Sequence, residues 1–81
     1  MNIQELLTAL ERLGIDPQAY DLEESARTEC YALSRESGHW NVFYKERGLR
    51  SGLQRFHAES AACEYLLELL ERDPGTRRAS R

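Results

Sequence analysis

Several residue types are scarce in this sequence, and each scarcity excludes a class of protein. The 81 residues contain only two cysteines, Cys30 and Cys63, a sparse set for the disulfide framework of a small secreted domain. We therefore expect both thiols to be reduced and buried. The first residues, MNIQELL, lack the basic start and long apolar run of a signal peptide, and no stretch reaches the length of a membrane span. These absences predict a cytoplasmic protein that does not contact a membrane.

Residues that catalyse reactions or bind metals are also few. The chain has two histidines, His39 and His57, and the cysteines and histidines lack the closely spaced pairs that zinc sites use. No pattern places a nucleophile, its base and an orienting group together, and there is no glycine-rich phosphate-binding loop. The sequence therefore predicts a protein that is not an enzyme and has no metal or cofactor site.

Length and composition are typical of one small globular domain. Hydrophobic residues make up 41% of the chain and charged residues 31%, which is ordinary for such domains, and a chain this short leaves little room for a large internal substrate pocket. We expect a single domain over residues 1–74 and a disordered basic tail over residues 75–81. Ten arginines against one lysine suggest a bacterial genome rich in G and C.

The first segment predicts a helix with defined ends. Asn2 and Glu5 match a capping box, and Gly14 is a suitable carboxyl-terminal stop. Apolar residues recur between them at helical spacing, at Ile3, Leu6, Leu7, Leu10 and Leu13. Residues 23–28 then form a predicted connecting loop.

From residue 29 onward the hydrophobic period becomes that of β-strands. Segments 29–37 and 39–47 predict two strands joined at Ser37-Gly38, a two-residue hairpin signal. A third strand is predicted over residues 53–57, after a turn that spans Gly48 to Gly52. Because the two apolar residues of this strand have opposite parity, we expect a bulge or an early strand end.

The last periodic segment predicts a helix over residues 59–72, which ends before Pro74-Gly75. Its apolar side comprises Ala62, Cys63, Leu66, Leu67, Leu69 and Leu70. The element order therefore predicts an α+β fold, with a helix, a three-stranded antiparallel sheet and a second helix. Both helices are expected on one sheet face, which leaves the other face partly open.

Charge is distributed unevenly, which bears on the kind of partner. Residues 45–57 carry four bases and one acid, whereas residues 1–29 and 58–74 are acidic. The same element order occurs in double-stranded RNA-binding domains, which contact RNA through the first helix, the first hairpin and lysines that open the last helix. Here the last helix opens with HAESAACE, and acids repel phosphates. Nucleic-acid binding stays an alternative, but a protein partner is favoured.

The strand at residues 39–47 carries three aromatic residues. With Trp40, Val42 and Tyr44 on one face, Phe43 and Lys45 fall on the other. We expect the Trp40 face to be buried beneath the helices and Phe43 to be partly exposed on the open face. Aromatic and arginine side chains on an exposed sheet suit a protein-binding patch; a merely solvated face is the alternative. A flat edge strand would also allow two copies to pair as a homodimer.

The segment WNVFYKERG, residues 40–48, resembles a group of short bacterial proteins encoded beside polymorphic toxin genes. That group has a W-x-V-Y-Y-S-E-R-G core, a later A-C-x-Y-L-L helix and an upstream G-I-x-P-x-x-Y segment. Matching residues here run from Gly14 to Tyr20 and from Ala62 to Leu67, so the resemblance covers residues 5–74 in outline. Lys45 replaces the serine, and His57-Ala58 replaces an acid-serine pair, which removes a side-chain helix cap.

The resemblance implies an immunity protein that binds a cognate toxin domain and blocks its active site. Acidic residues near the helices would steer a basic toxin, and arginine and aromatic side chains near the second strand would anchor it. The residues predicted to contact the partner are Asp21, Glu23, Glu24, Phe43, Lys45, Arg47 and Arg50.

Overall fold

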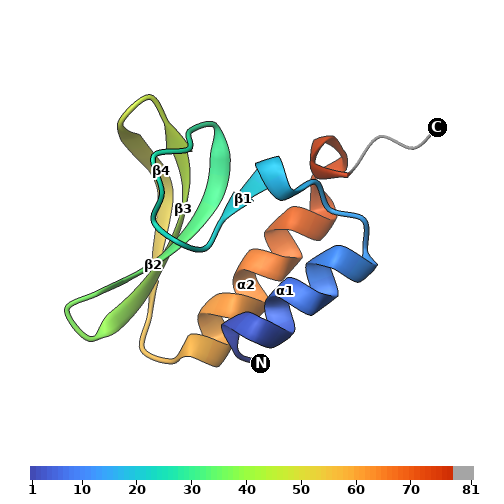
Figure 1. Cartoon of the computed structure of the whole chain (residues 1–81). Helices are drawn as coiled ribbons and strands as arrows, with labels where there is room; N and C mark the ends of the chain where they lie inside the picture. Colours follow the sequence, from blue (N-terminus) through green and yellow to red (C-terminus); the bar gives the residue numbers. More distant parts are fainter. Residues whose placement is uncertain (78–81) are drawn as a thin grey trace.

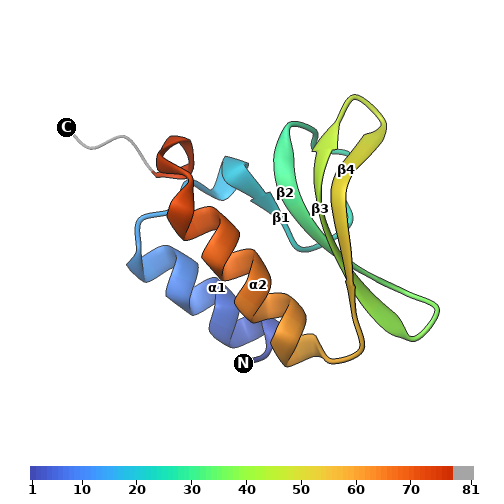
Figure 2. The same ribbon diagram turned by 180° about the vertical axis from the view of Figure 1, so that it is seen from behind.

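The computed structural model describes residues 1–77, in which two helices lie on one side of a four-stranded sheet (Figures 1 and 2). The strands pair in the order β1-β2-β3-β4. In chain order the elements are α1 (Ile3–Arg12), η1 (Pro17–Ala19), β1 (Tyr20–Asp21), β2 (Cys30–Glu36), β3 (His39–Glu46), β4 (Leu49–Phe56), α2 (Glu59–Arg72) and η2 (Pro74–Thr76). The predicted α+β class is confirmed.

Helix α1 has the ends that its sequence predicts. The Asn2 side chain accepts a hydrogen bond from the Glu5 amide at 2.8 Å, and the Glu5 carboxylate accepts one from the Asn2 amide at 2.9 Å. At the other end the Ile15 amide donates to the Leu10 carbonyl at 3.0 Å. Gly14, at φ +73°, supplies the left-handed residue that this termination requires.

The sheet differs from the prediction in its number of strands. A two-residue strand, β1, pairs in parallel with β2 at Tyr20↔Tyr31 and Asp21↔Ala32, so the sheet is mixed rather than three-stranded and antiparallel. Two residues cannot show a period, and therefore only the neighbouring strand reveals β1. The predicted β2–β3 hairpin is confirmed, with Ser37-Gly38 at its turn.

Strand β4 begins earlier than predicted, because the β3–β4 turn is also a two-residue turn, Arg47-Gly48. A bulge, one of the two alternatives expected, is present, but it lies before Gln54 and leaves Leu53 and Phe56 on opposite faces: Gly52 and Leu53 lie opposite Phe43 alone, between the pairs Val42↔Gln54 and Tyr44↔Ser51. Gly52 has φ +64°, the conformation that favours glycine at a bulge.

The core lies between the helices and the inner face of the sheet. Leu6 and Leu10 of α1, Leu66 and Leu70 of α2, and Val42 of β3 are fully buried. Burying such a side chain contributes about 1.5–3 kcal/mol, so this layer provides most of the apolar stabilisation. Both cysteines are free and buried, as predicted.

Trp40 shares the helix-facing side with Val42, as the alternation predicts, but it is only partly buried. It lies near the end of the β2–β3 hairpin, opposite Arg35 and Phe56. The Arg35 guanidinium stands 5.3 Å from the centre of the indole ring. The expected burial of Trp40 is therefore confirmed in part: it packs against the core, but the hairpin reaches past the helices (Figure 1) and leaves it incompletely covered.

Residues 75–77 are packed rather than disordered. The Thr76 hydroxyl donates to the Leu70 carbonyl at 2.7 Å, and Thr76 is buried. Arg77 pairs with Ile15 and donates to the Leu13 carbonyl at 3.0 Å. The predicted tail is thus wrong for these three residues, and residues 78–81 lie outside the described residues.

Candidate functional site

The sheet face turned away from the helices carries most of the residues predicted to bind a partner. We call it the open face. Its floor comprises Ala32 and Ser34 of β2 with Asn41 and Phe43 of β3, which alternate with the core residues Leu33 and Val42. From β4, Arg50 lies opposite Lys45 and Arg55 opposite Asn41. Phe56 faces the helices, where its ring packs on Tyr65. Because successive side chains of a strand point to opposite faces, Arg55 and Leu53 therefore lie on the open face.

A small hollow lies on the open face, and we call it the open-face pocket. Its volume is about 190 Å³. The loop over residues 22–29 forms one wall, and β4 contributes the other. The lining residues are Glu24, Ser25, Ala32, Leu33, Ser34, Phe43, Lys45 and Arg50. The pocket thus joins segments that are distant in the sequence.

One wall is held by the ion pair of Lys45 and Asp21. The Lys45 ammonium binds the Asp21 carboxylate and also donates to the Ser25 carbonyl at 2.9 Å. Asp21 additionally accepts from the Glu23 amide at 3.0 Å and from the Ser25 amide at 2.9 Å. Burial by itself raises the pKa of Asp21, but the hydrogen bonds from Lys45, Glu23 and Ser25 outweigh it and lower the pKa. This pair fastens the loop to the sheet.

Arg50 forms the opposite wall and covers Phe43. Its guanidinium lies 4.4 Å from the centre of the Phe43 ring, and its Nη2 atom donates to the Glu36 carboxylate at 2.9 Å. The hydrogen bond from Arg50 is the main cause that lowers the pKa of Glu36. Because the Arg50 side chain remains 45% exposed, the pair is accessible to a partner.

Two polar atoms beneath these charges have no hydrogen-bond partner. They are Ser34 Oγ and Asn41 Oδ1, in residues that are only 3% and 4% exposed. The Asn41 amide nitrogen does donate to Glu36 at 2.9 Å. The Ser34 hydroxyl also helps to lower the pKa of Glu36, although its contact with Glu36 does not meet the geometry of a hydrogen bond. A buried unpaired polar atom costs about 1–3 kcal/mol, so the floor of the open face is energetically incomplete.

The predicted partner-binding residues divide into three groups. Asp21, Phe43 and Lys45 are enclosed: Asp21 and Phe43 are each 3% exposed, and Lys45 is paired with Asp21. The prediction that Phe43 is partly exposed was wrong, because Arg50 lies over its ring. Glu24 and Arg50 line the open-face pocket.

Glu23 and Arg47 lie elsewhere on the surface and are exposed. Glu23 borders a different hollow, between α1 and the β1 segment. Arg47 stands at the β3–β4 turn with φ +42°, a conformation that an arginine seldom adopts.

Sequence reasoning predicted Arg50 but missed the other residues that β4 contributes. Leu49 and Leu53 are the exposed large hydrophobic residues of the described chain, at 69% and 41% exposure, and both belong to β4. Arg55 is exposed and forms no ion pair within residues 1–77. The signal was present in the segment LRSGLQRF, whose apolar and basic residues alternate irregularly around a glycine.

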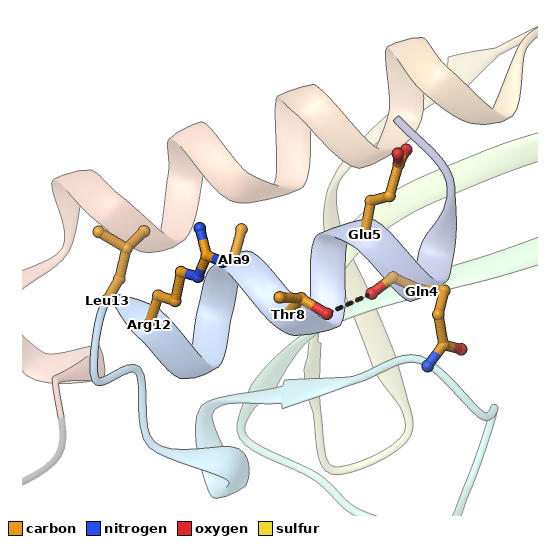
Figure 3. A pocket seen from close by; sticks show the side chains of 6 residues that line it. All are labelled: Gln4, Glu5, Thr8, Ala9, Arg12 and Leu13. Atoms are coloured by element: carbon orange, nitrogen blue, oxygen red, sulfur yellow. Dashed lines mark hydrogen bonds between the residues drawn. The ribbon is translucent and has the colours of Figure 1, made fainter.

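A hollow on α1 is larger than the open-face pocket but is not the best candidate site. It has a volume of about 430 Å³ but is lined by α1 alone, through Gln4, Glu5, Thr8, Ala9, Arg12 and Leu13 (Figure 3). The Thr8 hydroxyl already donates to the Gln4 carbonyl at 3.1 Å. A surface made by one helix has no opposite wall, so polar groups cannot converge on a ligand there.

The two buried cysteine thiols are not activated as nucleophiles. Burial raises the pKa of Cys63 to about 11 and also raises the pKa of Cys30, which disfavours the thiolate that a nucleophile requires. Within residues 1–77, no group of three or more acidic, histidine or cysteine side chains is placed to hold a metal ion. None of the helices in that range is long and apolar enough to span a membrane.

No protein-family model, curated protein or solved structure matches the chain.

Proposed function

We propose that this chain is a non-catalytic protein-binding domain whose open face and β4 contact the partner. The observation that carries the proposal is the pair of buried, unpartnered polar atoms, Ser34 Oγ and Asn41 Oδ1, on a sheet face that no helix covers. Beside them stand the half-exposed Arg50 and the exposed Leu53. Arginine and apolar side chains around an incompletely bonded floor suit a protein interface.

The partner that we propose is a bacterial toxin domain, which the chain would neutralise as an immunity protein in the cytoplasm by covering its active site. This more specific part rests on the resemblance at residues 40–48. That segment forms β3 and the β3–β4 turn. Most of it supports the fold: Val42 and Phe43 are buried, and Gly48 has φ +84°. Contacts that distinguish one toxin from another would therefore come from exposed residues outside this segment, such as Arg55.

Nucleic acid is a weaker candidate on this surface. Of the bases in residues 45–57, Lys45 is neutralised by Asp21 and Arg50 by Glu36. The affinity of a protein for a phosphate backbone grows with the number of phosphates it neutralises. We expect duplex RNA or DNA to bind no better than with micromolar affinity at physiological salt, which a fluorescence-anisotropy titration would check.

The proposal is tested by expressing the chain in bacteria together with the carboxyl-terminal domain encoded by the adjacent gene. We expect cells to survive and the two proteins to elute together in gel filtration. The variant Leu53→Asp with Arg55→Glu should lose protection, whereas the matched α2 variant Glu64→Lys with Glu68→Lys should keep it. Equal killing with and without the chain, and no complex, would refute the immunity function.

A further inference from the structure

Strand β4 forms one edge of the sheet, and nothing in the described chain lies beside its outer side (Figure 2). It is eight residues long, and seven of them are exposed. The opposite edge, β1, is only two residues long. An edge strand of this length presents a row of unpaired backbone amides and carbonyls that another strand can bind.

The middle of this edge is poorly protected against such pairing. Charged side chains commonly shield an edge strand, but Arg50 is drawn back over the sheet by Glu36 and by the Phe43 ring. The next residues are a serine, whose hydroxyl lies 3.5 Å from the Tyr44 carbonyl, and Gly52, which has no side chain. Leu53 follows and is 41% exposed.

The positive charges of β4 disfavour a second copy of the chain as the partner that pairs with this edge. If two β4 strands paired antiparallel over their whole length, Leu49 would face Phe56, and Arg50 would face Arg55 of the other copy. Two-fold symmetry would create this like-charge pair twice. Like charges directly opposite each other destabilise paired strands, so the homodimer that the sequence leaves open is disfavoured on this edge.

The bulge determines the spacing that a partner strand needs. Arg50 lies opposite Lys45, and Arg55 lies opposite Asn41. Because of the bulge, the five residue steps from Arg50 to Arg55 along β4 span the same length as four residue steps along a regular strand. Both arginines lie on the open face, and Leu53 lies between them. A regular strand on the outer side would therefore meet them with residues i and i+4, and its residue i+2 would lie beside Leu53.

We propose that the partner, which the proposed function takes to be a toxin domain, adds a β-strand to β4 through an acid–x–apolar–x–acid segment. The acidic side chains would pair with Arg50 and Arg55, and the apolar one would cover Leu53. This inference deepens the proposed function and rests on it. The partner strand would extend the sheet and bring its neighbouring residues over the open face, where Ser34 Oγ and Asn41 Oδ1 lack hydrogen-bond partners among residues 1–77.

The test uses the whole chain labelled with nitrogen-15 and a blocked synthetic peptide of alternating valine and threonine with two glutamates four residues apart. We expect the peptide to shift the β4 amide resonances and to slow their hydrogen exchange. A control peptide with lysines in place of the glutamates should bind about tenfold more weakly. In Arg55→Glu the preference should disappear, because each peptide then makes one attractive and one repulsive pair, and in the double variant Arg50→Glu with Arg55→Glu, if it folds, the preference should reverse.

Absence of β4 shifts at millimolar peptide, or equal binding of both peptides, would overturn the strand-addition proposal. A concentration-dependent dimer through β4 in sedimentation would overturn it as well. These outcomes differ from failure of the proposed function, which shows as absence of any complex with the toxin domain. If that complex forms and is weakened by Leu53→Asp while the peptide does not bind, the result would support docking on the open face and refute strand addition.

Discussion

The two faces of the sheet are buried to a similar degree by different means. On the helix-facing side Leu33 and Val42 are 2% and 0% exposed, and apolar residues of both helices pack in their layer. On the open face Ser34 and Asn41 are almost as inaccessible, but the groups around them are polar. These are the ion pair of Glu36 with Arg50, the hydrogen bond that the Asn41 side-chain amide donates to Glu36, and the loop held by Lys45. Apolar burial stabilises a fold, whereas polar burial costs free energy unless every group is paired. The helix-facing side therefore stabilises the fold, and under our proposal the open face binds the partner.

The largest effect is expected on the helix-facing side. Leu66 of α2 is fully buried in the core, and Leu66→Ala removes apolar contacts and leaves a cavity. We expect a loss of about 4 kcal/mol in the free energy of unfolding, measured by urea denaturation followed by circular dichroism. A loss below about 1 kcal/mol would show that this face does not dominate stability.

The next effect tests the ion pair that holds the open face. Asp21→Asn leaves the Lys45 ammonium without its carboxylate, and we expect a loss of about 3 kcal/mol at pH 7. The folded-state pKa of Asp21 lies below its ordinary value of 3.8. Its contribution is therefore complete above that value and is lost as the pH falls through the lowered folded-state pKa.

Urea denaturation of both proteins at a series of acidic pH values checks this sign. The natural chain should lose stability in acid more steeply than Asp21→Asn. If the two curves run parallel, Asp21 does not hold the loop through its charge.

A smaller effect of opposite sign sharpens the contrast between the faces. Ser34→Ala deletes a buried hydroxyl that has no hydrogen-bond partner, and we expect the free chain to gain about 1 kcal/mol. Under the proposed function, the same variant should bind the toxin domain more weakly in calorimetry, because it removes a group that the partner satisfies. Destabilisation of the free chain would mean that the Ser34 hydroxyl is already satisfied by Glu36.

The smallest effect concerns the β3–β4 turn. Arg47 has φ +42° at a turn position that asparagine and glycine favour. We expect Arg47→Asn to stabilise the free chain by about 0.5 kcal/mol, measured as a raised melting temperature. The matched change Arg35→Asn, within β2, should give no such gain, and equal gains at both positions would contradict the turn-specific explanation.

Local patterns in the sequence predicted much of the fold, because helix ends and hairpin turns are encoded by adjacent residues. Asn2, Gly14 and Ser37-Gly38 each act within a few positions, and the structure places helix ends and a turn at these residues. Strand β1 was missed because two residues carry no period and depend on β2 for pairing.

The candidate site was predictable only in part. Alternation placed Phe43 and Lys45 on the face opposite Val42, which the structure bears out. It could not show that Arg50 lies over Phe43 or that Asp21 binds Lys45, since these contacts join segments that are separate in the sequence. A bulge or an early strand end was predicted near Leu53, but the position of the bulge, which brings Leu53 and Arg55 to the open face, depends on pairing with β3.

Under the proposed function, the partner contacts the open face and β4 rather than the acidic helices. This is tested most directly by an amide-resonance map of the nitrogen-15-labelled chain, recorded with and without the proposed toxin partner. We expect shifts in β3, in β4 and in the loop over residues 22–29, with α1 and the exposed side of α2 unchanged. Shifts confined to α1 and α2, with β4 unaffected, would contradict it.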